Sequence, residues 1–127
     1  GKDGMLVSQG HLLEQALAAR EQLKAAGLDY GVVHHTYLNL FDGKFWQETF
    51  KNCQGNLITI EDHQEKGGIG NYLISQLSIH LPGMVKKSLA LGVAGKFGQS
   101  AHNSLELYKF HGLDGASIAK SAQKMIV

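Results

Sequence analysis

The side chains with the most capacity for chemistry lie together in residues 59–70. Three consecutive residues there, Glu61, Asp62 and His63, are types that act in general acid–base catalysis. Neighbouring side chains on an extended chain diverge, so all three cannot converge on one reacting atom. No distant partner is identifiable for any one of them, and we expect His63 to be an exposed or hydrogen-bonded loop residue.

Glycines Gly67, Gly68 and Gly70 follow, at the predicted start of a helix. Backbone N–H groups at a helix N-terminus attract anions, so one interpretation is a phosphate site. The spacing matches neither the dinucleotide-binding nor the P-loop pattern. Acidic residues of the preceding turn also place negative charge where a phosphate would lie. We therefore favour a structural role, in which Gly68 and Gly70 allow the helix backbone to pack against the sheet.

Other candidate sites are weaker. His34 and His35 are consecutive in a predicted strand and point to opposite faces, so they cannot chelate one metal ion. Cys53 is the only cysteine, which excludes an intrachain disulfide and a Cys-x-x-Cys metal site. No motif of a known nucleophile or zinc site occurs. We predict no catalytic and no metal-binding residue in this chain.

Composition limits the classes of protein. The 127 residues are 43% hydrophobic and 18% charged, with a net charge of +1. This excludes a disordered chain, and a dedicated nucleic-acid-binding domain is usually far more basic. No apolar run approaches the roughly 18 residues of a membrane span. We expect one cytoplasmic domain over residues 1–127, with no nucleic-acid or membrane partner.

The hydrophobic periodicity alternates between strand and helix. Strands are predicted at residues 5–8, 30–35, 56–60 and 88–93, and helices at 12–27, 44–53, 69–81, 103–112 and 115–127. Gly27 is placed to end the first helix and Asp114 to cap the last. The aromatic trio Phe45, Trp46 and Phe50 is interpreted as a hydrophobic plug, with base stacking as the alternative. This order predicts an α/β fold, a three-layer α/β/α sandwich with a mainly parallel sheet of about four strands.

The string TIEDHQEKGGIG at residues 59–70 resembles the C-terminal domain of transketolases, which have a strand ending in V/I-E-D-H, an acidic loop and a GG-I/L-G helix start. The resemblance covers practically the whole chain. Related dehydrogenase β-subunits and deoxyxylulose-phosphate synthases usually lack the Asp-His pair. Two departures are notable: Asn39-Leu40 replaces Lys-Pro, and residues 93–100 lack the family's Arg and Pro.

The resemblance implies a non-catalytic assembly or regulatory domain that is a fragment or subunit of a larger enzyme. Thiamine diphosphate and Mg²⁺ or Ca²⁺ would be bound by the other domains of a homodimer, and the intact enzyme would transfer a two-carbon ketol unit between sugar phosphates. The chain would begin after an antiparallel first strand, which leaves residues 30–35 as an edge strand that contacts another chain. The motif residues would be structural: Glu61, Asp62, His63, Gly67, Gly68 and Gly70.

The alternative is an autonomous α/β module that binds a small anion or nucleotide. Open parallel sheets bind ligands beyond the carboxyl ends of the strands, where the direction of winding reverses. By the family's topology that crevice lies between Gly10-His11 and the loop holding His63. The acidic residues of this loop disfavour an anion there.

Overall fold

A four-stranded parallel sheet forms the centre of the computed structural model, which describes residues 1–34, 41–64, 69–93 and 112–126. The strands are β1 (Gly4–Ser8), β2 (Tyr30–His34), β3 (Asn56–Gln64) and β4 (Lys87–Val93). Their order is β2-β1-β3-β4 and every neighbouring pair is parallel. The predicted sheet and its strand order are confirmed, and β2 lies at an edge.

The third strand is longer than the sequence predicts. The residue pattern predicted an end at Ile60 before an acidic turn, whereas the family's V/I-E-D-H strand end implied a longer strand; β3 continues to Gln64. The prediction was wrong because β4 reaches just as far: Gln64 pairs with Val93 after an irregularity in the register. An available neighbouring strand keeps the chain extended despite its polar sequence.

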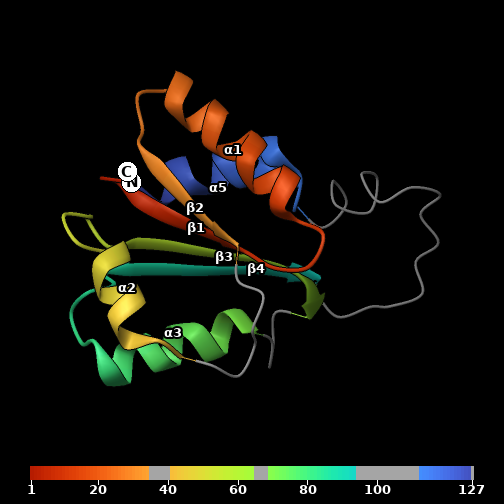
Figure 1. The fold of residues 1–127 in the computed structure, drawn as a ribbon. Coiled ribbons are helices and arrows are strands. Elements are labelled where there is room, and N and C mark those ends of the chain that lie inside the picture. Colours follow the sequence, from red (N-terminus) through yellow and green to blue (C-terminus); the bar gives the residue numbers. More distant parts are fainter. Residues whose placement is uncertain (35–40, 65–68, 94–111, 127) are drawn as a thin grey trace.

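In the described part of the chain, two helices cover each face of the sheet (Figure 1). One face carries α1 (Leu13–Ala25) and α5 (Gly115–Ile126), and the other carries α2 (Gly43–Thr49) and α3 (Ile69–His80). The three-layer sandwich is therefore confirmed, although α2 ends earlier than predicted. The helix predicted at residues 103–112 lies almost wholly outside the described residues.

The predicted helix boundaries have the expected local causes. Gly27 follows α1 with a φ of +84°, a conformation that glycine adopts without a Cβ penalty. Asp114 precedes α5, and its carboxylate accepts hydrogen bonds from the backbone N–H (3.3 Å) and hydroxyl (2.6 Å) of Ser117. Both assignments are confirmed.

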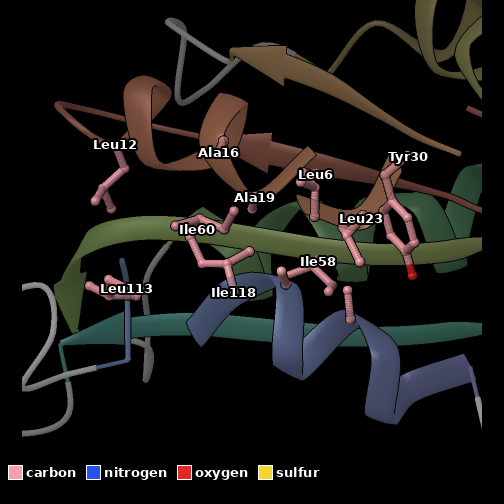
Figure 2. Close-up of a cluster of buried hydrophobic side chains, with 12 residues drawn as sticks. Leu6, Leu12, Ala16, Ala19, Leu23, Tyr30, Ile58, Ile60, Leu113 and Ile118 are labelled. Carbon is pink, nitrogen blue, oxygen red and sulfur yellow. The ribbon is translucent and has the colours of Figure 1, made fainter. Parts of the chain in front are cut away.

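Alternation along the strands divides the core into two clusters. Leu6, Ile58 and Ile60 point toward α1 and α5, as Figure 2 shows. Met5, Val7 and Leu57 point the other way, toward α2 and α3. The second cluster also contains Trp46 and Phe50, which are 1% and 3% exposed, so the hydrophobic-plug interpretation is confirmed for these two rings. Phe45 is 45% exposed.

Tyr30 gives the fold a predicted alkaline sensitivity. Its ring is 2% exposed, and its buried hydroxyl has no hydrogen-bond partner among the described residues. Burial, with contributions from Asp3 and Cys53, raises its pKa from 10.0 to about 12. Because the folded state holds this proton more tightly, its contribution to stability is complete below pH 10 and is lost as pH rises toward 12.

We therefore expect Tyr30→Phe to flatten the fall in unfolding free energy between pH 10 and 12, by roughly 2–3 kcal/mol at the upper end. Near pH 7 the variant should be at least as stable as the natural chain, because it removes a buried unpaired hydroxyl. Urea denaturation at several pH values measures both effects. Tyr72→Phe, at a 40% exposed ring, is the matched control and should leave the profile unchanged. Identical profiles for Tyr30→Phe and the natural chain would contradict the assignment.

Candidate functional site

Glu61 is buried at the junction between β3 and α3. Its side chain is 2% exposed, and Oε2 accepts a hydrogen bond from the Gly70 backbone N–H at 2.9 Å. A carboxylate at this position also interacts favourably with the positive end of the α3 dipole. The sequence placed Glu61 in an acidic loop, which is wrong. Its carboxyl group occupies the helix N-terminus where we had considered a bound phosphate.

Gly70 brings the helix backbone against the sheet. A Cβ built on this residue would overlap the Thr59 hydroxyl and would lie 3.3 Å from the Ala90 Cβ. Even a methyl side chain there would require Thr59 to shift. The close packing expected of Gly70 is confirmed, whereas Gly67 and Gly68 lie outside the described residues.

Asp62 and His63 lie within β3. His63 is therefore not in a loop, and that expectation was wrong. The strand continues past Ile60 because β4 pairs with it as far as Gln64. Whether its side chain is exposed or hydrogen-bonded lies outside what the structure describes. Glu61, Asp62 and His63 are consecutive residues of β3, and the register of the strand is irregular between Ile60 and Gln64.

At the carboxyl ends of β1 and β3, where we proposed a crevice, the described residues pack closely. The Gln9 N–H donates to the Ile60 carbonyl at 2.9 Å, which continues the β1–β3 pairing beyond Ser8. Gly10 and His11, the residues we named for a ligand, are exposed. Beneath them lies a cavity of about 10 Å³, lined by Val7, Gln9, Thr59, Ile60, Glu61, Gly70 and Leu73. This volume suits one water molecule, so the cavity formed by these described residues takes no nucleotide and does not favour the alternative of a ligand-binding module.

A serine–histidine pair also lies at the carboxyl end of the sheet, and the sequence analysis did not identify it. Ser8 Oγ and His34 Nδ1 are 2.9 Å apart. The two residues end β1 and β2 and are direct partners in the parallel register. Aligning the ends of the two predicted strands would have brought them together. Ser8 is fully buried, so its oxygen cannot reach a substrate, and the pair joins two strands rather than forming a nucleophile and base.

A larger hollow of about 550 Å³ lies at the opposite end of the sheet. Its charged residues are two cations and two carboxylates, and Arg20 is paired with Glu21 at 3.4 Å. This balance gives the hollow no preference for a ligand of either charge. Its lining is formed by Arg20, Glu21, Lys24, Gly27, Leu28, Asp29 and Tyr30.

Metal-ligating side chains do not gather in the described part of the chain. Within those residues, no three His, Cys, Asp or Glu side chains are placed to hold a metal ion together. Cys53 is a free, half-buried thiol. His34 is engaged with Ser8, and His35 lies outside the described residues. None of the helices in the described ranges has the length and apolar character that crossing a membrane requires.

Comparison with known proteins gives one consistent result. The family model described as "Transketolase, C-terminal domain" matches residues 1–118. A Methanocaldococcus jannaschii protein named for a transketolase C-terminal section is 33% identical over 120 residues, which are 94% of this chain and 36% of that protein. Human transketolase is 30% identical over 121 residues, which are 95% of this chain and 19% of the human protein. The chain thus spans about a third and about a fifth of these two relatives.

The fold matches a solved structure described as a split-gene transketolase in the form of an inactive β4 tetramer. The TM-score is 0.83 and the sequence identity is 28%. The match covers 99% of this chain and 40% of that one. Sequence and fold therefore agree on the same family.

Proposed function

The chain belongs to the transketolase C-terminal domain family, and from that membership we propose that it is the C-terminal domain of a transketolase, with an assembly role and no catalytic residue of its own. Residues 1–127 form a single domain that is part or a subunit of a larger enzyme. The intact enzyme transfers a two-carbon ketol unit between sugar phosphates. The observation that carries the proposal is the family match over residues 1–118, nearly the whole chain.

The family motif has a structural role in this proposal. Glu61 and Gly70 fix α3 to the sheet through their 2.9 Å hydrogen bond and the close approach of Gly70 to Thr59. We assign the same kind of role to the rest of the motif: Asp62, His63, Gly67 and Gly68.

The cofactor of the intact enzyme, thiamine diphosphate with Mg²⁺ or Ca²⁺, is held by other domains in this proposal. These cations take oxygen ligands, chiefly carboxylates, carbonyls and phosphates. The two buried carboxylates of the described residues, Glu61 and Asp114, each accept a backbone N–H bond at the start of a helix. They lie at the starts of two different helices, α3 and α5. The cavity beside Glu61 has a volume of about 10 Å³. The described residues therefore do not fit the cofactor.

Titration calorimetry with thiamine diphosphate and Mg²⁺ tests this proposal. We expect no saturable binding to the isolated chain and no ketol transfer by it. A complete transketolase, titrated under the same conditions, is the positive control. Saturable one-to-one binding at micromolar affinity would contradict the non-catalytic assignment and would direct attention to the Gly10–His63 region.

Partners of the chain are the remaining transketolase domains or subunit and further copies of itself. We propose a homodimeric intact enzyme in the cytoplasm. The structural relative described as a β4 tetramer supports self-association of this fold. A net charge of +1 gives no reason to expect a nucleic-acid partner.

A further inference from the structure

The dipeptide Asp-Gly occurs three times in this chain, at residues 3–4, 42–43 and 114–115. Such a pair can rearrange without an enzyme. The glycine nitrogen attacks the carbon of the aspartate carboxyl group and one water molecule is lost, which gives a cyclic imide. Water then opens the ring at the other carbonyl, so that the main chain continues through the side-chain carbon as isoaspartate. Glycine favours the attack because it has no Cβ and a freely rotating backbone.

The first pair, Asp3 and Gly4, is held in the sheet. Gly4 begins β1, is buried, and pairs with β2 on one side and with β3 on the other. The Asp3 carboxylate accepts a hydrogen bond from the Asp29 N–H at 2.7 Å, and the Asp3 N–H donates to the Asp29 carbonyl at 2.9 Å. The imide ring can close only after this carboxylate leaves Asp29 and the chain rotates at the start of β1.

The third pair, Asp114 and Gly115, is held in the core at the start of α5. The Asp114 carboxylate is buried and accepts two hydrogen bonds from Ser117. The attacking group is engaged as well, because the Gly115 N–H donates to Gln15 Oε1 at 2.9 Å. A Cβ on Gly115 would lie 2.8 Å from the Ala18 Cβ, so this backbone is packed tightly against α1. Both reacting groups are therefore restrained.

The second pair, Asp42 and Gly43, lies at the surface. Asp42 is exposed, and the hydrogen bond that the described residues give its carboxylate is a single one of 3.2 Å, from the Phe45 N–H. Gly43 is the first residue of α2, where the N–H has no acceptor within the helix. A Cβ on Gly43 would meet only Phe41, at 3.4 Å, so no neighbour in the described ranges packs closely on this backbone. Water reaches the carboxyl group, and little restrains either reacting group.

We propose that Asp42 is a modification site, at which the folded chain converts spontaneously to isoaspartate in preference to Asp3 and Asp114. The reaction loses one water molecule when the imide forms and regains one when it opens. In the product the main chain is one carbon longer and the free carboxylate is attached to the α-carbon. That carboxylate no longer caps the Phe45 N–H, so the start of α2 is weakened. The product is also of the class that isoaspartyl methyltransferases esterify with S-adenosylmethionine.

Peptide mapping after prolonged incubation in warm neutral buffer tests the proposal. Trypsin separates the three pairs, because they lie in the peptides 3–20, 25–44 and 110–120. Mass spectrometry with electron-transfer fragmentation distinguishes isoaspartate from aspartate in each peptide. In the folded chain, peptide 25–44 should contain at least about tenfold more isoaspartate than the other two, because restrained pairs react only through local opening. In concentrated urea all three pairs should react at comparable rates, since the fold no longer protects any of them.

Two variants serve as matched controls. Asp42→Ser removes the reacting carboxyl group and keeps a side chain that caps helices, so peptide 25–44 should form no isoaspartate at this position. Gly43→Ala keeps the carboxyl group and adds a methyl group for which there is room, and it should slow the reaction. Neither should change the other two peptides, and circular dichroism checks that both variants are folded.

Equal isoaspartate in the three peptides of the folded chain would overturn the proposal, because exposure of Asp42 would then make no difference. So would a larger amount at Asp3 or Asp114, or a peptide 25–44 that stays unmodified. None of these outcomes depends on cofactor binding or ketol transfer, which separately test the proposed function.

Discussion

Replacing Gly70 with valine is expected to lower the unfolding free energy by about 1–3 kcal/mol or more, because the new side chain has no space between α3 and the sheet. A Cβ alone would overlap the Thr59 hydroxyl and approach Ala90. Moving α3 outward to relieve the overlap would lengthen the 2.9 Å hydrogen bond from the Gly70 N–H to the buried Glu61 carboxylate. The reduced freedom of the unfolded chain stabilises such variants by only about 0.4–1 kcal/mol, so the steric effect dominates.

Gly43→Val is the matched control for this experiment. Gly43 begins α2, and a Cβ there meets only Phe41, at an ordinary contact distance of 3.4 Å. We expect its unfolding free energy, measured by urea denaturation, to change by less than about 1 kcal/mol. Equal shifts for the two valine variants would show that Gly70 is not a packing glycine. The corresponding prediction for Gly68→Val concerns a residue outside the described ranges and stays a prediction from the sequence.

Trp46→Ala is expected to destabilise the domain by about 3–5 kcal/mol, the range measured when large aromatic side chains are removed from protein cores. Trp46 is 1% exposed in the cluster that joins α2 and α3 to the sheet. Its ring packs edge-on against the Phe45 ring, with ring centroids 5.1 Å apart. The Phe50 ring is tilted relative to it, with centroids 6.2 Å apart. Its removal would leave a cavity that these rings can fill only in part.

Phe45→Ala provides the comparison, because it removes a neighbouring ring that is 45% exposed. We expect a loss below about 1.5 kcal/mol for this variant. Thermal or urea unfolding monitored by circular dichroism suits both proteins, since Trp46 is the only tryptophan available for fluorescence. A small loss for Trp46→Ala would indicate that its ring serves a surface role such as stacking, the alternative that we did not favour.

Most of the architecture follows from the sequence. The alternation of apolar runs with helical periodicity predicts the parallel sheet, and the resemblance at residues 59–70 implies its strand order. The ends of α1 and α5 follow from Gly27 and Asp114. The helix ends depend on residues within one or two turns of each other, so the local sequence contains the necessary information for them.

The chemistry of the candidate site depended on tertiary structure. Glu61 is a strongly polar residue beyond an apolar strand, which in sequence resembles an exposed turn. It is buried because α3 packs over it and because Gly70 has no side chain to prevent that approach. Likewise, Ser8 and His34 meet only because β1 and β2 pair in one particular register.

The sequence alone thus determined the fold class, the strand order through the family resemblance, and the absence of a known catalytic motif. Only the tertiary structure decided that β3 pairs with β4 as far as Gln64, that Glu61 occupies the N-terminus of α3, and that the described residues beside Gln9 leave room for a single water molecule. The physical reason is the range of the interactions. Periodicity and capping act between neighbours in the chain, whereas burial of a carboxyl group and packing around a cavity depend on segments far apart in sequence that pack together.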